Sequence, residues 1–272
     1  MYLWNTDIEM YGFFNTMSQI FVFIFNLIFW SKKSKILGRG SSLLAKAFSR
    51  KDVKKQQVAS VFFTLTEILF ITYMQYVLAG SFNRYFGDWV GTGFNYYGLA
   101  LFSPILVSLS CFLLGIDIFK QMDLITPAYP FGLIFVKLAC FCQGCCKGMV
   151  CPSFGLYNNL TRQIEFPVQL VEMTLAAIIF VFLMCNRKKF KEGTMFPIYL
   201  IIYSATRFFS EFLRQEENVF FILKKYHLLC LMGIVVGLLE LFIVNKYKDK
   251  IQKYCSLYFD FIEKTFNKIV KH

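Results

Sequence analysis

The sequence predicts an all-α membrane protein of about seven transmembrane helices, with its N-terminus outside and its C-terminus in the cytoplasm. Its 272 residues are 57% hydrophobic and 19% aromatic but only 17% charged, whereas a soluble domain is about 45–50% apolar and about 25% charged. Several apolar runs also have the length of a helix that crosses a bilayer. These two observations exclude an ordinary cytosolic enzyme, a disordered chain, a fibrous repeat and a small disulfide scaffold.

Seven apolar runs are the candidate spans. In chain order they are residues 11–30, 58–78, 96–116, 127–142, 167–185, 195–213 and 228–244. The fourth is short for a spanning helix, which needs about 17–25 residues. No internal repeat or linker separates these runs, so we expect one membrane domain, residues 1–244, followed by a basic amphipathic cytoplasmic tail, residues 245–272.

The basic residues lie between the apolar runs and indicate the orientation. Of the 29 Lys and Arg, nine lie in residues 31–56, four in 186–193, one at Lys120 and seven after residue 244. The positive-inside rule places these loops in the cytoplasm. The net charge of +12 therefore indicates topology rather than a nucleic-acid surface, which needs its cations on one face. Asp7 and Glu9 precede the first run without Lys or Arg, so no cleavable signal peptide is expected.

The tail carries apolar residues at every third or fourth position. They are Ile251, Cys255, Tyr258, Ile262, Phe266 and Ile269, with lysines mostly off that stripe. This pattern suits a helix lying on an anionic lipid surface. It equally suits a basic helix that packs on the protein's own loops, and the sequence leaves both interpretations open.

Ionisable residues inside spans are costly and are therefore functional candidates. The orientation places Lys137, Glu172, Arg207 and Glu211 in the outer half of their helices. Arginine binds phosphate through two parallel hydrogen bonds, so this group predicts a cavity, open to the outer leaflet, for a phospholipid headgroup. The alternative is that Arg207 neutralises Glu211 and Lys137 neutralises Glu172, with no ligand.

Four sequence stretches occur in the same order as motifs of a known family. They are Pro-Phe-Gly-Leu at 130–133, Val-Lys-Leu-Ala-Cys-Phe-Cys-Gln-Gly-Cys-Cys-Lys-Gly at 136–148, Pro-Val-Gln-Leu-Val-Glu at 167–172, and Tyr-Ser-Ala-Thr-Arg with Glu-Phe-Leu-Arg-Gln at 203–207 and 211–215. They resemble the prolipoprotein diacylglyceryl transferases, seven-span bacterial enzymes of lipoprotein biosynthesis. The resemblance covers the C-terminal half well and the N-terminal half poorly.

The resemblance implies transfer of diacylglyceryl from phosphatidylglycerol to the thiol of a lipobox cysteine in a prolipoprotein signal peptide, at the bacterial plasma membrane. Membrane lipids are further partners; no nucleic acid, cofactor or metal is expected. The catalytic residues it implies are Arg207, Tyr97, Lys137 and Glu211. The substrate-binding residues it implies are Tyr203, Arg214, Gln143, Gln169 and Glu172.

The sequence also departs from the family's pattern at positions that the resemblance implies are functional. The family's histidine falls on Tyr97, its first signature arginine on Lys137, and its signature glutamate on Cys145. A tyrosine, with an ordinary pKa of ~10, is a poor base for a thiol of pKa ~8.5 unless cations lower its pKa. The alternatives are therefore a catalytically altered or inactive lipid-binding relative acting on another acceptor and, with no paired broken spans to support it, a small transporter.

Five cysteines lie within twelve residues on the side predicted to be outside. They are Cys140, Cys142, Cys145, Cys146 and Cys151. Disulfides that staple the outer loop are one interpretation, because oxidation is possible there. A zinc site is expected to use well-separated Cys-x-x-Cys units, often with His among the ligands, and Cys142 with Cys145 is one such unit that lacks a clear second. A covalent relay through Cys145 or Cys146 is a third alternative.

Overall fold

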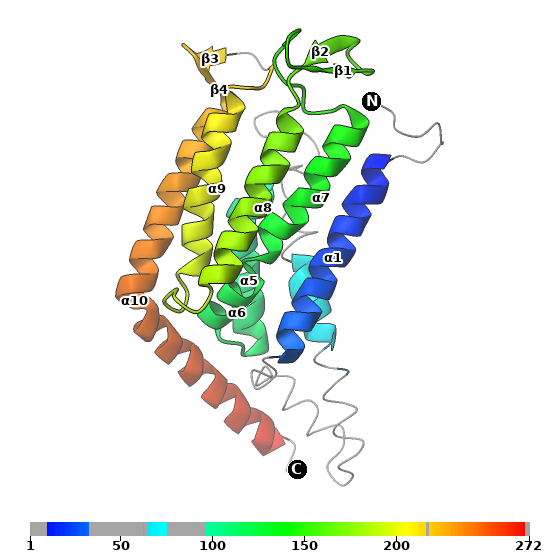
Figure 1. The fold of residues 1–272 in the computed structure, drawn as a ribbon. Coiled ribbons are helices and arrows are strands. Elements are labelled where there is room, and N and C mark those ends of the chain that lie inside the picture. The colour runs from blue at the N-terminus through cyan, green and yellow to red at the C-terminus, as the bar shows by residue number, and fades with distance from the viewer. Residues whose placement is uncertain (1–9, 33–61, 63–64, 75–95, 216–217, 270–272) are drawn as a thin grey trace. The chain divides into compact units, whose positions relative to one another are not determined.

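The structure is a computed structural model that describes residues 10–32, 62, 65–74, 96–215 and 218–269 (Figure 1). Its helices are α1 (Met10–Lys32), α5 (Tyr96–Leu114), α6 (Ile118–Ile125), α7 (Ala128–Gln143), α8 (Val168–Asn186), α9 (Met195–Glu211) and α10 (Lys225–Ile269). The described residues are mostly helical, as predicted, and add two short antiparallel hairpins that the sequence did not indicate. They pair β1 (Leu156–Asn158) with β2 (Gln163–Glu165), and β3 (Asn218–Phe220) with β4 (Leu223–Lys224). Strands this short carry no readable alternation.

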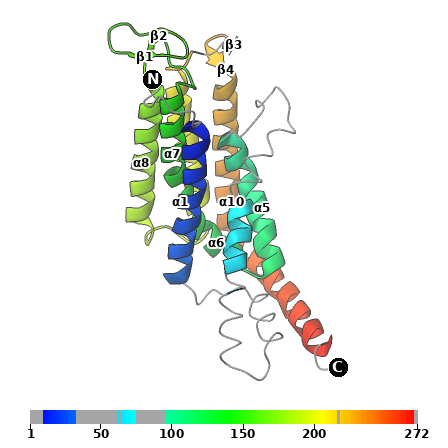
Figure 2. The ribbon, with the colours of Figure 1, turned by 90° about the vertical axis from the view of Figure 1, so that its right-hand side faces the viewer.

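The chain divides into two compact units. The first comprises Met1–Val22, Thr126–Lys191 and Met195–Leu241; the second comprises Phe23–Ile125, Glu192–Thr194 and Phe242–His272. In the first unit both hairpins lie at the same end of α7, α8 and α9 (Figures 1 and 2). The last turns of α7 and α9 and the first turn of α8 lie at this end, so side chains from three helices meet there.

Aromatic packing forms the core of the first unit. The rings of Tyr129 and Phe196 lie 5.4 Å apart and those of Tyr129 and Tyr199 lie 5.7 Å apart, and all three side chains are buried. The Ser18 hydroxyl of α1 donates to the Gly132 carbonyl at 2.9 Å. Each buried aromatic ring removes a large apolar area from solvent, so α7 and α9 are held in a fixed register.

Two glycines let α10 approach α9 closely. A Cβ atom at Gly233 would lie 2.3 Å from the Ser204 hydroxyl oxygen, and one at Gly237 would lie 2.7 Å from the Ile201 side chain and 3.1 Å from the Pro197 carbonyl oxygen. The two glycines are four residues apart and so share a face of the helix. Small residues at this spacing are typical of close helix packing in membranes.

The second unit shows how the tail packs. Residues beyond 244 continue α10 without a break, and Phe259 is buried, with its ring where a Cβ atom on Gly115 would be. The Gln252 amide donates to Asp117 at 2.9 Å. The tail thus packs against the loop that carries Gly115 and Asp117. Among the described residues of the tail, the exposed large apolar side chains are Tyr247, Tyr254, Leu257, Tyr258 and Phe261, of which Tyr258 alone is on the predicted stripe.

Within the described residues, three helical segments are long and apolar enough to cross a membrane: Ile118–Gln143, Val168–Asn186 and Lys225–Thr265. The apolar helices Thr16–Ile28 and Phe102–Leu114 are shorter. Of the predicted second span, residues 58–78, residue 62 and residues 65–74 lie within the described residues. The sixth predicted span corresponds to α9, which has 17 residues and therefore rises about 26 Å. The structure thus supports a mostly helical membrane protein.

Replacing Gly237 by leucine should loosen the contact between α9 and α10, because the added side chain must displace Ile201 and the Pro197 backbone. Overpacking of this kind costs about 1–3 kcal/mol. We expect the thermal midpoint of Gly237→Leu in detergent to fall by several degrees, while Val235→Leu, at an exposed position of the same helix, leaves it unchanged. Equal midpoints for the two variants would show that this contact does not stabilise the fold.

Candidate active site

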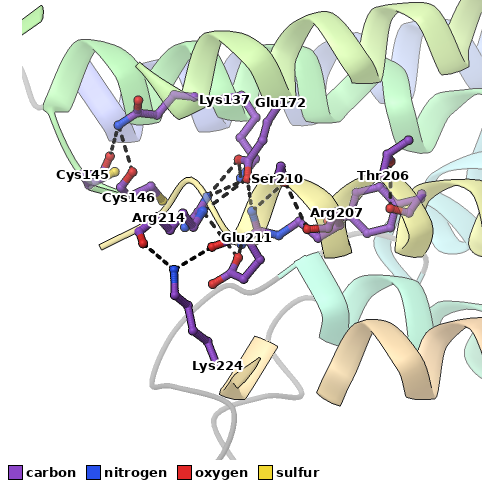
Figure 3. A network of polar contacts seen from close by, with 12 residues as sticks. Lys137, Cys145, Cys146, Glu172, Thr206, Arg207, Ser210, Glu211, Arg214 and Lys224 are labelled. Atoms are coloured by element: carbon purple, nitrogen blue, oxygen red, sulfur yellow. Dashed lines mark hydrogen bonds and ion pairs between the residues drawn. The ribbon is translucent and has the colours of Figure 1, made fainter. Parts of the chain in front are cut away.

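Glu172, in the first turn and a half of α8, is the centre of a buried ionic network (Figure 3). Its Oε2 atom lies 2.6 Å from the Lys137 ammonium of α7 and 2.8 Å from an Arg214 nitrogen that follows α9. Its Oε1 atom binds Arg207 of α9 and lies 3.2 Å from the Ser210 hydroxyl. All of these side chains are buried. A buried carboxylate needs such partners, because an unpaired charge in a low-dielectric interior is very costly.

A second carboxylate and a fourth cation extend the network. Glu211, the last residue of α9, is completely buried and lies 2.6 Å from Arg207 and 3.7 Å from Arg214. Lys224 of β4 donates from its ammonium group to the Glu211 carbonyl at 2.8 Å and to the Arg214 carbonyl at 2.5 Å. It thereby binds carbonyl groups at the end of α9 that have no partner within the helix.

The network is formally positive. In the described part of the chain it holds four cationic side chains, from Lys137, Arg207, Arg214 and Lys224, and two carboxylates, from Glu172 and Glu211. Its formal charge is therefore +2. A phosphodiester carries one negative charge, so binding such an anion here would reduce the imbalance of buried charge.

A narrow crevice with a cavity volume of about 10 Å³ opens onto this network. Lys137, Glu172 and Arg207 line its charged end, and Tyr203, Thr206 and Ser210 line it beside them. Its remaining wall is apolar and consists of Leu133, Leu175, Ala176 and Ile179. A site that is charged at one end and apolar along its side suits a molecule with an anionic headgroup and a hydrocarbon part.

Backbone hydrogen bonds fix the segment that carries Arg214. The Met149 amide donates to the Leu213 carbonyl at 2.8 Å, and the Gln215 amide donates to the Lys147 carbonyl at 3.1 Å. Gly148 lies opposite Arg214 in this short bridge, and a Cβ atom on it would stand 1.9 Å from the Phe166 carbonyl oxygen. No larger residue fits there without moving the backbone, so the glycine allows the close approach that positions Arg214.

A tight turn after α7 brings three cysteines together. The helix ends at Gly144, whose φ of 74° is left-handed and suits glycine. The Gln169 amide nitrogen donates to the carbonyls of Cys145 at 2.6 Å and Cys146 at 3.0 Å. The sulfur atoms of Cys140, Cys145 and Cys146 all lie within 4.8 Å of one another.

Hydrogen bonding with the neighbouring thiols of Cys140 and Cys145 holds the pKa of the Cys146 thiol well below its ordinary value, and the nearby Lys137 and Arg214 cations act in the same direction. Hydrogen bonds to a charged form stabilise that form. Cys146 is therefore the thiol of the cluster that ionises most readily, and it is partly accessible.

The structure brings together six of the predicted site residues. Lys137, Glu172, Arg207, Glu211 and Arg214 form the network, and Tyr203 lines the crevice. Both pairings that the ligand-free alternative required, Arg207 with Glu211 and Lys137 with Glu172, are present within it. The surplus of cations distinguishes the observed network from two neutral pairs.

The remaining predicted residues lie elsewhere. Gln169 holds the cysteine turn through its amide nitrogen, and Gln143 is exposed at the end of α7. Tyr97 begins α5, in the other unit, and its side chain is outside the described residues, so its role stays a prediction. The five clustered cysteines are free thiols in the structure, and the close group joins Cys140 to Cys145 and Cys146 rather than Cys142 to Cys145.

Sequence analysis missed Ser210, Lys224, Tyr226 and His227. Ser210 lies three residues after Arg207, so helical spacing could have identified it. The Tyr226 ring lies 5.8 Å from the Arg207 guanidinium carbon. The hairpin β3–β4 carries Lys224 back to the end of α9, and no periodicity in the sequence indicates this return.

His227 is the one histidine within the described residues, and it is fully buried. Its Nδ1 atom accepts the Lys224 amide hydrogen at 2.9 Å, and its ring packs 4.3 Å from that of Phe212 and 4.8 Å from that of Phe208. Because Nδ1 accepts, the neutral ring carries its proton on Nε2. Neither nitrogen is then available to take a proton from a substrate, so His227 anchors the hairpin and is not the base.

Comparison with known proteins agrees with this geometry. The family model for prolipoprotein diacylglyceryl transferase matches residues 2–243. The chain belongs to the prolipoprotein diacylglyceryl transferase family. The resemblance noted in the sequence is thereby confirmed, and the family match extends into the N-terminal half, where the motifs are faint.

Several curated relatives carry the name phosphatidylglycerol–prolipoprotein diacylglyceryl transferase. The protein of Clostridium tetani is 30% identical over 158 residues, which are 55% of this chain and 63% of the relative. That of Chlorobaculum tepidum is 34% identical over 132 residues, 45% of this chain and 46% of the relative. A second such enzyme of Clostridium perfringens is 28% identical over 167 residues, 59% and 65% of the two chains. The alignments thus span about half to two thirds of these relatives, and no solved structure matches the chain.

Removing the charge of Glu172 should destabilise the protein strongly, because three buried cations lose their shared carboxylate. Breaking a buried ionic network in this way costs about 3–5 kcal/mol. We expect Glu172→Gln to lower the free energy of unfolding in detergent by that amount. Glu192→Gln, which breaks a partly exposed pair with Lys248, should change it by less than about 1 kcal/mol. Similar losses in both variants would contradict a central role for Glu172.

The lowered pKa of Cys146 predicts an unusual pH profile of alkylation. A thiol of pKa ~8.5 loses roughly two orders of magnitude of its thiolate between pH 8 and pH 6. In folded protein, Cys146 should keep its reactivity towards iodoacetamide over this range, since its thiolate is lost only when the pH falls through the lowered pKa. Peptide mapping by mass spectrometry, with chelator present, gives the rates. The denatured chain is the control, and the same steep decline in the folded protein would refute the prediction.

Proposed function

We propose that this protein transfers the diacylglyceryl group of phosphatidylglycerol to the lipobox cysteine thiol of prolipoproteins. The observation that carries the proposal is the crevice with a net positive end and an apolar wall, built from the residues that match the family's motifs. The relatives' names give the reaction, and the geometry fits its lipid substrate. Arg207, Lys137 and Arg214 then face the headgroup phosphate, and the apolar wall holds the start of the acyl region.

The chemical step forms a carbon–sulfur bond and breaks a carbon–oxygen bond. The acceptor sulfur attacks the terminal glycerol carbon of the diacylglyceryl group, and the electron pair of the broken bond stays on the phosphate oxygen of the departing glycerol phosphate. Negative charge therefore grows on the leaving group. Preorganised cations in a water-poor site stabilise such charge more than water does. Glu172 and Glu211 keep the guanidinium groups of Arg207 and Arg214 in place before the lipid arrives.

The topology is part of the proposal. The chain is placed as a multi-pass protein of the bacterial plasma membrane, with seven spans, an outer N-terminus and a cytoplasmic C-terminus. The distribution of Lys and Arg supports this orientation. It puts the network, at the hairpin end of α7, α8 and α9, in the outer leaflet, where a prolipoprotein signal peptide presents its cysteine after export.

The orientation predicts which thiols a membrane-impermeant maleimide reaches in intact cells. A cysteine introduced by Phe154→Cys, at an exposed position of the hairpin side, should be labelled. The exposed Cys185, near the end of α8 beside four basic residues, should be labelled only after the cells are opened. Mass spectrometry distinguishes the peptide with the introduced cysteine at position 154 from the peptide with Cys185, so one sample provides both the test and its control. Labelling of Cys185 in intact cells would contradict this orientation and show that the end of α8 faces the outside.

Transfer itself is tested with purified protein, phosphatidylglycerol and a lipobox peptide. We expect the peptide to gain the mass of one diacylglyceryl group, and a peptide with serine in place of the cysteine to gain none. Arg207→Ala should reduce the rate at least about a hundredfold, as the loss of a transition-state donor does. Lys147→Ala, an exposed cation near the same end, is the matched control and should retain the rate.

Two results would contradict the proposal. Transfer that survives in Arg207→Ala would show that the network does not bind the reacting lipid. A wild-type protein that binds phosphatidylglycerol tightly yet gives no product would instead identify a lipid-binding relative that has lost the reaction.

A further inference from the structure

The described residues of the site offer no evident base. Glu172 is bound by three cations, Glu211 by Arg207 and Arg214, and His227 already carries its proton on Nε2. The three-thiol cluster of Cys140, Cys145 and Cys146 lies beside this network, since Lys137 and Arg214 both act on Cys146 electrostatically. Its own chemistry has no part in the lipid-binding site described above.

We propose that Cys140, Cys145 and Cys146 bind one zinc ion through three thiolates and leave its fourth position to the acceptor thiol. The metal site itself is independent of the proposed transfer reaction, whereas the role of the fourth position rests on it. Among the described residues, these three sulfur atoms form the group of potential metal ligands close enough to bind one ion.

The geometry is close to that of a zinc–thiolate site. Zinc–sulfur bonds of about 2.3 Å in a tetrahedron place the sulfur atoms about 3.8 Å apart. The three sulfur atoms here lie within 4.8 Å of one another, so a contraction of about 1 Å or less completes the set. Sites with three protein ligands and one open position are the catalytic kind, whereas structural sites have four protein ligands.

Side-chain hydrogen bonds fix the turn that carries the cluster. Gln169 binds the carbonyls of Cys145 and Cys146, and Asn158 of β1 donates to the Gly144 carbonyl at 2.9 Å. Cys146 itself has a φ of 61°, a left-handed conformation that non-glycine residues rarely adopt. The surrounding hydrogen bonds hold the backbone of the turn that carries Cys145 and Cys146.

The charges of the surroundings fit a thiolate-rich metal site. Three thiolates and one Zn²⁺ sum to a charge of −1, and the acceptor thiolate would make it −2. Lys137 and Arg214 favour the thiolate form of Cys146. A formal charge of +1 remains on the neighbouring network when a phosphodiester is bound there, and it stabilises the negatively charged metal site. A soft sulfur set of this kind selects zinc or copper(I) over calcium or magnesium.

Zinc would activate the acceptor thiol at a site whose described residues offer no base. A thiol that coordinates zinc is deprotonated, and its proton passes to solvent. The bound thiolate then attacks the glycerol carbon: the carbon–sulfur bond forms, the carbon–oxygen bond breaks, and glycerol phosphate leaves with the electron pair. The thioether product is a weaker ligand than a thiolate, so the acceptor dissociates and zinc remains. No step oxidises or reduces any group.

The first experiment measures metal content, which does not depend on activity. The full chain is purified in detergent from cells supplied with zinc and analysed by inductively coupled plasma mass spectrometry. We expect one zinc per wild-type chain and less than about 0.1 in Cys140→Ser and Cys146→Ser. Cys142→Ser is the matched control, because Cys142 is buried in the same helix yet lies outside the cluster. Helical circular dichroism equal to wild type shows that each variant is folded.

Three outcomes would overturn the site. One is a wild-type protein that stays without zinc after reconstitution. Another is a loss of zinc in Cys142→Ser as large as that in Cys146→Ser. The third is a wild-type mass lower by two hydrogens on a peptide joining two of the cluster cysteines, which identifies a disulfide in place of a metal site.

The second experiment tests the fourth position in cobalt-substituted protein. Addition of a lipobox peptide should change the visible cobalt spectrum, and the serine peptide should leave it unchanged. An unchanged spectrum with both peptides would refute the role of the fourth position. Chelated protein that still transfers diacylglyceryl at the full rate would uphold the proposed function and overturn this inference. Zinc bound by the cluster without any transfer would uphold the metal site and overturn the proposed function, so the two failures are distinguishable.

Discussion

The buried carboxylate of Glu172 is the constraint on which the site depends. A charge in the interior of a helical membrane protein is tolerated only with partners in hydrogen-bonding reach, and Glu172 finds them on two other elements, Lys137 on α7 and Arg207 on α9. The three helices must therefore meet at one level and with one rotation. The aromatic core around Tyr129 and Tyr199 and the glycine face of α10 hold them at that level. The site is thus a product of helix packing rather than of a loop.

The network and the turn after α7 share one helix. Gln169 and Glu172 are three residues apart and so lie on the same face of α8; one holds the cysteine turn and the other the cations. The position of the sulfur atoms relative to the crevice is therefore set by a single rigid element. In the proposed reaction the lipid carbon and the acceptor sulfur must meet in line with the leaving oxygen, and an error of about 1 Å in such a distance is costly.

The sequence predicted the part of this arrangement that helical periodicity and composition encode. The spacing of Arg207, Glu211 and Arg214 placed them on one face, and the predicted orientation brought them to the level of Lys137 and Glu172. Lys224 and the grouping of Cys140 with Cys145 and Cys146 could not be predicted, because they depend on a hairpin return and on a left-handed turn. Tyr97 was predicted from the family's motif order alone, and its role still rests on that order. The exposed face of the tail depends on what α10 packs against, which the 3.6-residue period does not contain.

The sharing of charges among helices also bears on how the chain enters the membrane. An arginine at the centre of a lone helix opposes insertion by about 2.5–3.5 kcal/mol. The cost is smaller towards a helix end, where α9 carries Arg207 and, as its last residue, Glu211. Only residues 187–194 separate α8 from α9, so Glu172 is at hand when α9 leaves the ribosome. In the proposed topology these two helices would insert as one hairpin, with their opposite charges already paired. The architecture that positions a phosphate would then also be the one that permits biogenesis of the helix that carries it.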